Sequence, residues 1–199
     1  LIDAAVRDRT PVYGVTTGLG PRVVEALNED EISAFALSAV RGRAHSAGDD
    51  LPEAACRAAK GVRINTLLTG AAGARPEMAE HLAACLNAGL SPVIRGVGSI
   101  GAADLMWGGD FGLALIGEGR MWRAGEVLPA TDALAGAGLA PFIPAPREGL
   151  ALVSHSSPSA AIASLGVGAL SSLYDSADTA TALTLEGFRA NLSAFDLDL

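Results

Sequence analysis

The chain has 199 residues, half of them hydrophobic, so it is long enough to bury a core as one domain or as one large piece of a domain. Its formal net charge of −8 and its scattered basic residues argue against nucleic acid or an anionic membrane as a partner. No segment contains about 18 uninterrupted apolar residues, so we expect no membrane-spanning segment.

The two cysteines bear on the cellular compartment, and the first residue bears on whether the chain is part of a longer protein. Cys56 and Cys85 stand alone, without the spacing of a metal site, and we expect both to be inert core residues. Two isolated thiols in an acidic chain without a leader indicate the reducing cytoplasm and no metal. Because the chain starts at Leu1 rather than Met, we expect it to be part of a longer protein.

Hydrophobic periodicity predicts helices through most of the first half of the chain. Pro52 and Pro76 suit the first turn of a helix, where the missing N–H has no partner to lose. The sequence Asn87-Ala88-Gly89 is typical of a helix end, because glycine adopts the left-handed conformation there. We therefore expect helices over residues 30–47 with a stop at Gly48, over residues 52–70, and over residues 76–87.

The second half of the chain is expected to mix helices with shorter elements. Residues 120–123 and 126–128 flank Ala124-Gly125 and predict a short β-hairpin. The prolines in residues 141–146 disfavour helix in the residues before them, so this stretch should be extended. Around these elements we expect a loop over residues 90–101, a helix from there to about Ile116, a brief helix over 131–137 and a long helix from Pro158 to about Ala190.

Residues 96–101 match the dinucleotide-binding pattern G-x-G-x-x-G letter for letter. In a dinucleotide-binding fold these glycines permit a tight turn and the close approach of a pyrophosphate to a helix N-terminus. Here the preceding strand signal is short, and the segment after the helix reads as a hairpin rather than a parallel strand ending in an acidic residue. This context favours a glycine turn that lets two helices pack closely.

Several stretches share the order found in one enzyme family. They are YGVTTGLG (13–20), RINTLLTGAAGARPE (63–77), PVIRGVGSIGAADL (92–105), LIGEG (115–119), REGLALVSHSS (147–157) and LTLEGFRANLSAFD (183–196). In these stretches the chain resembles the N-terminal part of the histidine and phenylalanine ammonia-lyase family. The resemblance implies an all-α fold with short β-hairpin and loop elements and an aspartase/fumarase-like helical architecture. Residues 1–199 would then form an N-terminal lyase-family domain that a central helical bundle follows.

The resemblance also implies a chemistry. The family eliminates ammonia from an amino acid through a methylidene-imidazolone, an internal electrophile made from Ala-Ser-Gly by cyclisation and loss of water, and it needs no external cofactor. Tyr13 matches the tyrosine that acts as general base, and Gly18 and Gly20 match backbone positions on the pocket floor. His45 matches the histidine of a Ser-His pair, with Ala44 in place of the serine.

The histidines also have structural interpretations. A lone histidine near a helix end, such as His45, fits a dipole partner or a core residue as well as a site residue, and both interpretations stay open. His81 falls on the polar side of the third expected helix and should be solvated. His155 stands where the family has a glycine, so no role carries over to it.

The chain departs from the family where the electrophile is made. The family's Ala-Ser-Gly-Asp-Leu is matched by Ala102-Ala103-Asp104-Leu105, and an alanine methyl has no leaving group from which a methylidene could form. Ser154 stands where the family has an active-site asparagine. A true one-residue deletion explains the count, and so does a fused cofactor residue written under one letter with an extra alanine after it. The lost asparagine favours divergence.

The sequence therefore predicts an ammonia-lyase-like protein that is divergent or inactive, in which the methylidene-imidazolone is not formed. A non-catalytic binding or assembly homologue, or an aminomutase-like enzyme, is the alternative. We expect an amino acid or carboxylic acid as ligand, and either a homo-tetramer or a C-terminal half to cover exposed apolar faces. Tyr13, Gly20, His45, the loop 98–104 and Ser154 should converge on one pocket, with the amides of residues 103–105 pointing into it.

Overall fold

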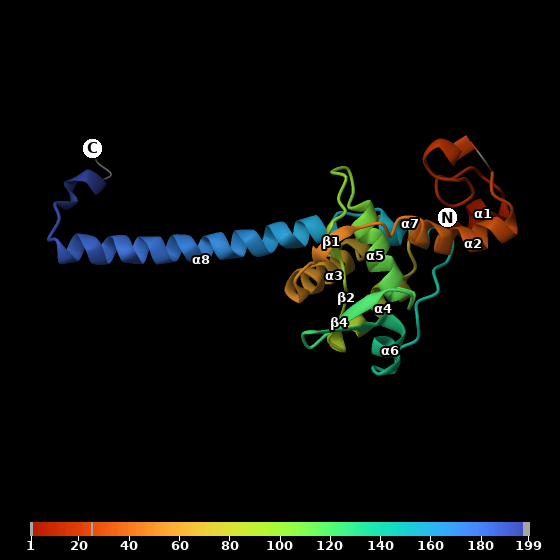
Figure 1. The fold of residues 1–199 in the computed structure, drawn as a ribbon. Helices are drawn as coiled ribbons and strands as arrows, with labels where there is room; N and C mark the ends of the chain where they lie inside the picture. Colours follow the sequence, from red (N-terminus) through yellow and green to blue (C-terminus); the bar gives the residue numbers. More distant parts are fainter. Residues whose placement is uncertain (1, 25, 197–199) are drawn as a thin grey trace. The chain divides into compact units, whose positions relative to one another are not determined.

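A computed structural model describes residues 2–24 and 26–196, and the chain divides into two compact units, Leu1–Ile162 and Ala163–Leu199. Helices dominate both units, and all the strands are short and belong to the first unit (Figure 1). The expected fold class, all-α with short hairpin and loop elements, is confirmed. Three short helical elements of the first unit are α1 (Ile2–Arg7), η1 (Gly20–Val24) and α6 (Ala130–Ala135), the last of which confirms the brief helix expected there.

Helices α3 (Glu53–Leu67) and α4 (Pro76–Asn87) lie where the sequence predicts them. Pro76 occupies the first turn of α4, as expected. Ala88 closes α4, and Gly89 follows it with a φ of 73°, the left-handed conformation that ends a helix.

Helix α2 (Glu29–Arg41) ends earlier than its periodicity predicts. Asn28 and Glu31 form a reciprocal capping box at its start, and Gly42 is its C-cap. The prediction of a helix through residue 47 is wrong, because the chain leaves the helix to form β1 (Ala47–Asp50), which pairs with the antiparallel strand β3 (Arg95–Val97). The strand partner satisfies backbone groups that a longer helix would have paired internally.

A second set of antiparallel strands fixes the segment after α4. The buried strand β2 (Leu90–Pro92) pairs with β4 (Arg120–Arg123), which pairs in turn with β5 (Glu126–Pro129). Ala124 and Gly125, between β4 and β5, have φ values of 52° and 87°, which gives the turn a twist that matches the strands. The hairpin is thus confirmed, whereas the loop expected before the next helix contains β2 and β3.

Helix α5 (Leu105–Leu115) packs against its neighbours at backbone distance because of its glycines. A Cβ on Gly108 would lie 2.2 Å from the Val153 carbonyl oxygen, at the end of α7 (Glu148–Val153). A Cβ on Gly109 would lie 2.4 Å from the backbone of Arg43, just after α2. Even a methyl side chain does not fit at these contacts, so the glycines set the distance between α5 and its neighbours α2 and α7.

The glycine run before α5 also serves packing. A Cβ on Gly98 would lie 2.2 Å from the indole ring of Trp107, so only glycine lets this loop lie on the ring. The strand that precedes the run, β3, is antiparallel to its partner. The described residues therefore contain no βαβ unit at this position, and the packing interpretation is the one that the fold supports.

The burial expected from the sequence is confirmed for two cysteines of α3 and α4 and is wrong for one histidine of α4. Cys56 and Cys85 are free and buried, as expected, and burial raises the pKa of Cys56 to about 11. His81 is half-buried, and its ring centroid lies 5.5 Å from that of Phe142. The prediction that His81 is solvated is wrong, because the extended segment after α6 brings Phe142 onto α4, and burial lowers the pKa of His81.

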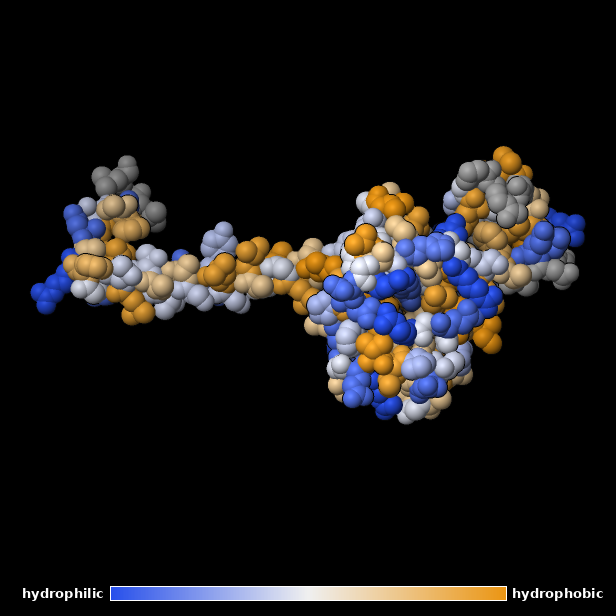
Figure 2. Space-filling model, viewed as in Figure 1, coloured by the Kyte–Doolittle hydropathy of each residue, from blue (hydrophilic) through white to orange (hydrophobic). Residues whose placement is uncertain are grey.

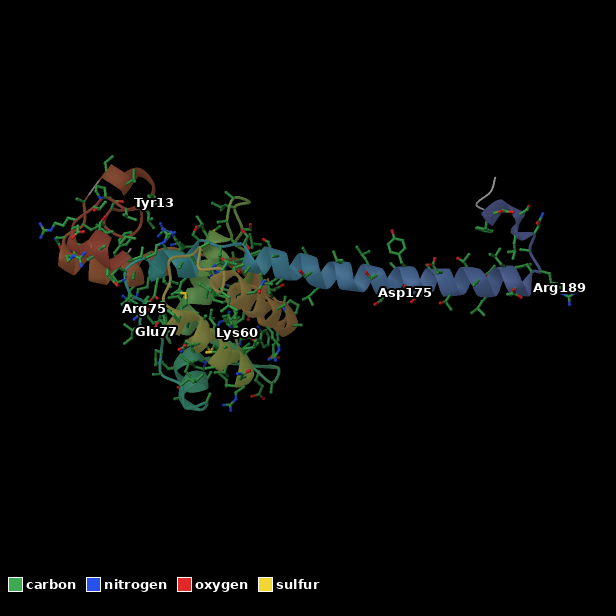
Figure 3. All side chains as sticks on the ribbon, turned by 180° about the vertical axis from the view of Figure 1, so that it is seen from behind. Tyr13, Lys60, Arg75, Glu77, Asp175 and Arg189 are labelled. Carbon is green, nitrogen blue, oxygen red and sulfur yellow. The ribbon has the colours of Figure 1, made fainter. Side chains whose placement is uncertain are left out.

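Lys60 on α3 is an unusual member of the core. Figure 3 labels its side chain. It is fully buried (0% exposed), and its Nζ has no hydrogen-bond partner among the described residues. Burial lowers the pKa of Lys60 to about 8, and the nearby charge of Arg57 lowers it further, whereas Cys85 and Glu53 act in the opposite direction.

Helix α8 (Ser157–Gly187) begins in the first unit and continues through the second, where η2 (Leu192–Phe195) follows it. The expected long helix is confirmed. Its apolar side chains after Ile162 are exposed and recur along its length (Figure 2), namely Leu165, Val167, Leu170, Leu173 and Leu183.

The stretch Glu148–Gly187 meets the length and composition criterion for a membrane span, and 44% of its apolar window is buried within the protein. Core helices of soluble proteins meet the same criterion, so the expected lack of a membrane span stays a prediction.

Candidate functional site

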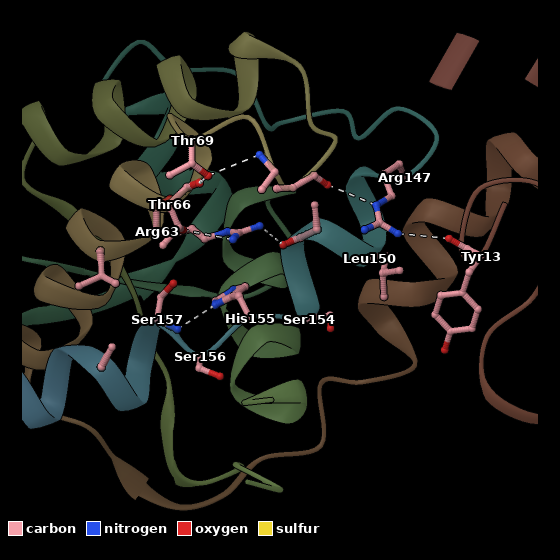
Figure 4. A pocket seen from close by; sticks show the side chains of 15 residues that line it. Tyr13, Arg63, Thr66, Thr69, Arg147, Leu150, Ser154, His155, Ser156 and Ser157 are labelled. Carbon is pink, nitrogen blue, oxygen red and sulfur yellow. Dashed lines mark hydrogen bonds between the residues drawn. The ribbon is translucent and has the colours of Figure 1, made fainter. Parts of the chain in front are cut away.

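A cavity of about 620 Å³ opens in the first unit between α3, α7 and the start of α8 (Figure 4). Two arginines, a histidine and several hydroxyl side chains line it, and none of its lining residues is an aspartate or glutamate. The residues used below are Tyr13, Arg63, Thr66, Arg147, Ser154, His155, Ser156 and Ser157. The cavity therefore combines a largely apolar lining with basic and hydroxyl side chains and has no acidic side chain.

Tyr13 enters the cavity wall from a loop that glycines shape. Gly14 and Gly20 have φ values of 68° and 59°, in the left-handed region that favours glycine. The Gly20 N–H donates to the Tyr13 hydroxyl at 3.1 Å, so these two predicted site residues lie together. Gly18 is buried in the same loop, but it does not line the cavity.

Arg147 ties three segments of the wall to one another. Its Nη1 donates to the Tyr13 carbonyl oxygen at 3.2 Å, and its Nε donates to the Ala72 carbonyl oxygen at 3.3 Å. The φ of Arg147 is 78°, a conformation that a non-glycine residue adopts only when its surroundings impose it. Arg147 thus holds Tyr13 at the cavity. The sequence analysis gave Arg147 no role.

The short helix α7 is fixed by an ion pair between its buried first residue, Glu148, and the exposed Arg75. Glu148 is 1% exposed and accepts hydrogen bonds from Arg75 Nε at 3.0 Å and Arg75 Nη2 at 2.8 Å. The backbone N–H groups of Arg75 and Ala145 donate to the same carboxylate at 2.8 and 2.7 Å. These charge-assisted bonds fix the position of the helix that carries much of the cavity wall.

Arg63 reaches the cavity from α3. It is 5% exposed, and its Nη2 donates to the Ala151 carbonyl oxygen at 2.5 Å while its Nη1 donates to Thr66 Oγ1 at 3.3 Å. Its Nε has no partner among the described residues. Burial lowers the pKa of Arg63 to about 10, which still leaves the guanidinium charged at neutral pH.

His155 joins the end of α7 to the start of α8. Its Nε2 lies 3.0 Å from the Leu152 carbonyl oxygen, and its Nδ1 accepts the Ser157 N–H at 3.3 Å, so the proton is assigned to Nε2. Burial lowers the pKa of His155 to about 3, and the charge of Arg63 lowers it further. His155 is therefore neutral, and both of its ring nitrogens are used in holding the wall together.

Asp104 lies behind the same wall. It is buried, its N–H donates to the His155 carbonyl oxygen at 2.9 Å, and its carboxylate accepts from Ser159. The expectation that the amide of Asp104 points into the cavity is wrong, because this amide is paired with His155. Asp104 stands at the start of α5 but makes no side-chain capping bond there.

The predicted site residues are thus brought together only in part. Tyr13 and Ser154 line the cavity, Gly20 contacts Tyr13, and Asp104 lies behind His155. His45 is exposed and does not line the cavity, nor do Ala102 and Ala103. The convergence of all these residues on one pocket stays a prediction.

The whole chain, residues 1–199, matches the family model described as aromatic amino acid lyase. The chain belongs to this family. Histidine ammonia-lyase of Bacillus subtilis (strain 168) is 34% identical over 199 residues, which is 100% of this chain and 39% of that protein. The lyase-family chain therefore spans about two fifths of the length of this relative.

Solved structures of the same architecture include enzymes with other activities. The ergothioneine-degrading enzyme ergothionase from Treponema denticola superposes with a TM-score of 0.92 at 27% identity, covering 99% of this chain and 40% of that one. Phenylalanine aminomutase from Pantoea agglomerans superposes with a TM-score of 0.91 at 26% identity, covering 98% and 38%. These similarities establish the helical lyase architecture expected from the sequence.

The residues of this chain do not fit the internal electrophile that the lyase family uses. Ala102 and Ala103 offer only methyl groups, from which no water can be lost. The next backbone nitrogen, that of Asp104, is hydrogen-bonded to the His155 carbonyl oxygen rather than placed for cyclisation. No reaction step through a methylidene-imidazolone is derived for this site.

Proposed function

We propose that the chain forms one wall of an amino-acid-binding pocket of the ammonia-lyase type, and that it binds an amino acid or carboxylic acid without forming the methylidene-imidazolone. One observation carries this proposal. Tyr13 and Ser154 line a cavity with two arginines and no acidic residue, while Ala103 stands where a dehydratable serine is needed.

The missing electrophile limits what this pocket can do. An amino group is a poor leaving group and the adjacent β-proton is weakly acidic, so elimination of ammonia needs strong stabilisation of the developing charge. Ala103 removes the group that supplies this stabilisation in the family. We therefore expect no ammonia-lyase activity on histidine from this chain.

A second candidate is an elimination that needs no electrophile, and the similarity to ergothionase favours it. A quaternary amine leaves as a neutral molecule once the β-proton is removed, so a betaine such as ergothioneine needs only a base and a bound carboxylate. Tyr13 would take the proton, and an arginine of the cavity would bind the carboxylate. An aminomutase-like activity remains the further alternative.

We also propose that the protein works in the cytoplasm as a homo-tetramer or joined to a C-terminal half. The exposed apolar side chains of α8 support a partner that buries them, because soluble monomeric proteins rarely expose a large contiguous apolar surface. The two isolated thiols support the compartment.

Calorimetric titration of the purified protein with L-histidine, trans-urocanate and ergothioneine tests the proposed function, with ammonia and trimethylamine release measured in parallel. We expect binding of at least one of these acids and no ammonia from histidine. Trimethylamine release that the Tyr13→Phe variant abolishes would select the second candidate. Ammonia release from histidine would contradict the proposal.

A further inference from the structure

Arg63 carries a buried positive charge that nothing in the described part of the chain neutralises. Its side chain is 5% exposed, and the only influence on its pKa is burial, with no contribution from a neighbouring carboxylate. The ion pairs formed by described residues involve Arg7, Arg41, Arg75, Arg95 and Arg120 but not Arg63. A buried guanidinium without a counter-ion destabilises the folded protein, so binding of an anion next to it is favoured.

The two buried acids of the described residues, Glu148 and Asp104, already have other partners. Glu148 accepts hydrogen bonds from Arg75 and Ala145 with both of its oxygens. Asp104 accepts from the backbone and hydroxyl of Ser159 with both of its oxygens. Neither carboxylate can turn to Arg63 without breaking these bonds.

The helix start beside the cavity does not offer an alternative anion site. At the beginning of α8, the Ser157 N–H donates to His155 Nδ1, and the Ser159 N–H donates to the Asp104 carboxylate. The Ala160 N–H donates to the Ser156 carbonyl oxygen, and Pro158 has no N–H. These amides are used within the protein, so an anion in the cavity depends on side-chain donors.

The two arginines of the cavity have different tasks. The guanidinium of Arg147 donates hydrogen bonds to the carbonyl oxygens of Tyr13 and Ala72, so Arg147 is a positioning residue. Arg63 is held in place by Ala151 and Thr66, which use two of its five N–H donors, and its Nε has no partner. It is therefore pre-organised with donors in reserve.

We propose that Arg63 is the anion anchor of this cavity and that it binds the carboxylate of the ligand, with the neighbouring hydroxyl of Ser157 as an additional donor. The identity of the anion rests on the proposed function, whereas the anchor itself rests on Arg63 and its surroundings. Arg63 of α3 would then select the ligand. A ligand with a free carboxylate should bind, whereas the corresponding carboxamide should not.

The test compares the Arg63→Met and Arg63→Lys variants with the wild-type protein by calorimetric titration and thermal unfolding. Arg57→Met is the matched control, because Arg57 lies on the same helix, is exposed and does not line the cavity. The probes are trans-urocanate, L-histidine, L-histidinamide and acetate, which carries the carboxylate alone.

We expect the acids to bind the wild type and Arg57→Met equally, to bind Arg63→Met weaker by about tenfold or more, and to bind Arg63→Lys at an intermediate level. L-histidinamide should bind weakly to all four proteins. Without ligand, Arg63→Met should unfold at the wild-type temperature or above it, because an uncompensated buried charge is removed. A lower unfolding temperature with unchanged acid affinity would show that Arg63 is structural and would overturn the proposal.

Acetate separates the anchor from the proposed function. If acetate raises the unfolding temperature of the wild type and not of Arg63→Met, the anchor stands even where none of the larger acids binds, and the proposed function alone fails. If the larger acids bind wild type and Arg63→Met with equal affinity, the proposed function stands and the anchor is overturned. Equal binding of L-histidine and L-histidinamide to the wild type would also overturn it.

Discussion

The carboxylate of Asp104 caps helix α8 by accepting the N–H of Ser159 at 2.8 Å and its hydroxyl at 2.6 Å. Asp104 ends the loop that carries the electrophile in the lyase family, and Ser159 follows the cavity-lining residues 154–157. The pair therefore joins the altered loop to the wall of the cavity. These hydrogen bonds hold the cavity wall in place although Ala103, the residue before Asp104, is an alanine.

Loss of this cap should destabilise the first unit. Asp104→Ala leaves the amide and the hydroxyl of Ser159 without their acceptor, and we expect the free energy of unfolding to fall by about 2 kcal/mol. Asp104→Asn keeps one acceptor and should cost less. Urea denaturation measures both, with Asp49→Ala, an exposed aspartate of β1, as control. An Asp104→Ala variant as stable as the control would refute the capping role.

The glycines of α5 should be intolerant of a methyl group where a glycine of α3 is not. Gly108→Ala places a Cβ 2.2 Å from the Val153 carbonyl oxygen, and the backbone shift it forces should cost about 1–3 kcal/mol. Gly61→Ala is the matched control in α3, where a Cβ meets nothing within 4 Å, and it should be neutral or stabilise by up to about 1 kcal/mol. Equal stabilities for the two variants in urea would contradict the backbone-distance packing of α5.

Lys60 should make stability depend on alkaline pH. Its pKa is lowered from 10.5 to about 8 in the folded protein, so between these values the unfolded chain binds more protons than the folded one. The raised pKa of Cys56 acts in the opposite direction above pH 9 in both proteins, so the Lys60 effect is the difference between the wild type and Lys60→Met. Relative to Lys60→Met, the wild type should gain stability as the pH increases from 8 to 10.5, by about 3 kcal/mol at most. Lys60→Met should also be more stable than the wild type at pH 7. A stability difference between the two proteins that does not change with pH would contradict a charged, unpaired Lys60.

The exposed apolar side chains of α8 should drive association. Leu170 and Leu173 are 54% and 62% exposed, and we expect sedimentation to show a species larger than a monomer. Leu170→Glu with Leu173→Glu should shift the protein toward the monomer, whereas Ser172→Glu, an exposed position between them, should shift it less. A wild-type chain that sediments as a stable monomer would contradict the proposed assembly.

The sequence predicted the elements whose signals are local. Pro52, Pro76 and Gly89 mark helix ends through their own backbone preferences, so α3 and α4 lie where they were expected. The end of α2 was wrong, because residues 47–50 pair with a strand far along the chain, and no local pattern reports that pairing. Helix α7 was missed because all six of its residues are buried, which leaves no polar side to give a helical period.

The site was predicted where the family's motifs survive and missed where tertiary contacts create it. Tyr13 and Ser154 carry motif positions and line the cavity. Arg63 and Arg147 also lie in those motifs, but a sequence does not show that one arginine is buried without a counter-ion and that the other bonds to carbonyl oxygens. His81 was misplaced for the same reason, since its neighbour Phe142 lies far along the chain.

The central claim is that this member of the lyase family keeps the pocket architecture without the internal electrophile. The mass of the intact, purified protein tests it most directly, because cyclisation with dehydration removes two waters. The account predicts the full mass of the 199-residue sequence and no near-ultraviolet absorbance band that cyanide or borohydride bleaches. A mass lower by two waters, together with such a band, would contradict it.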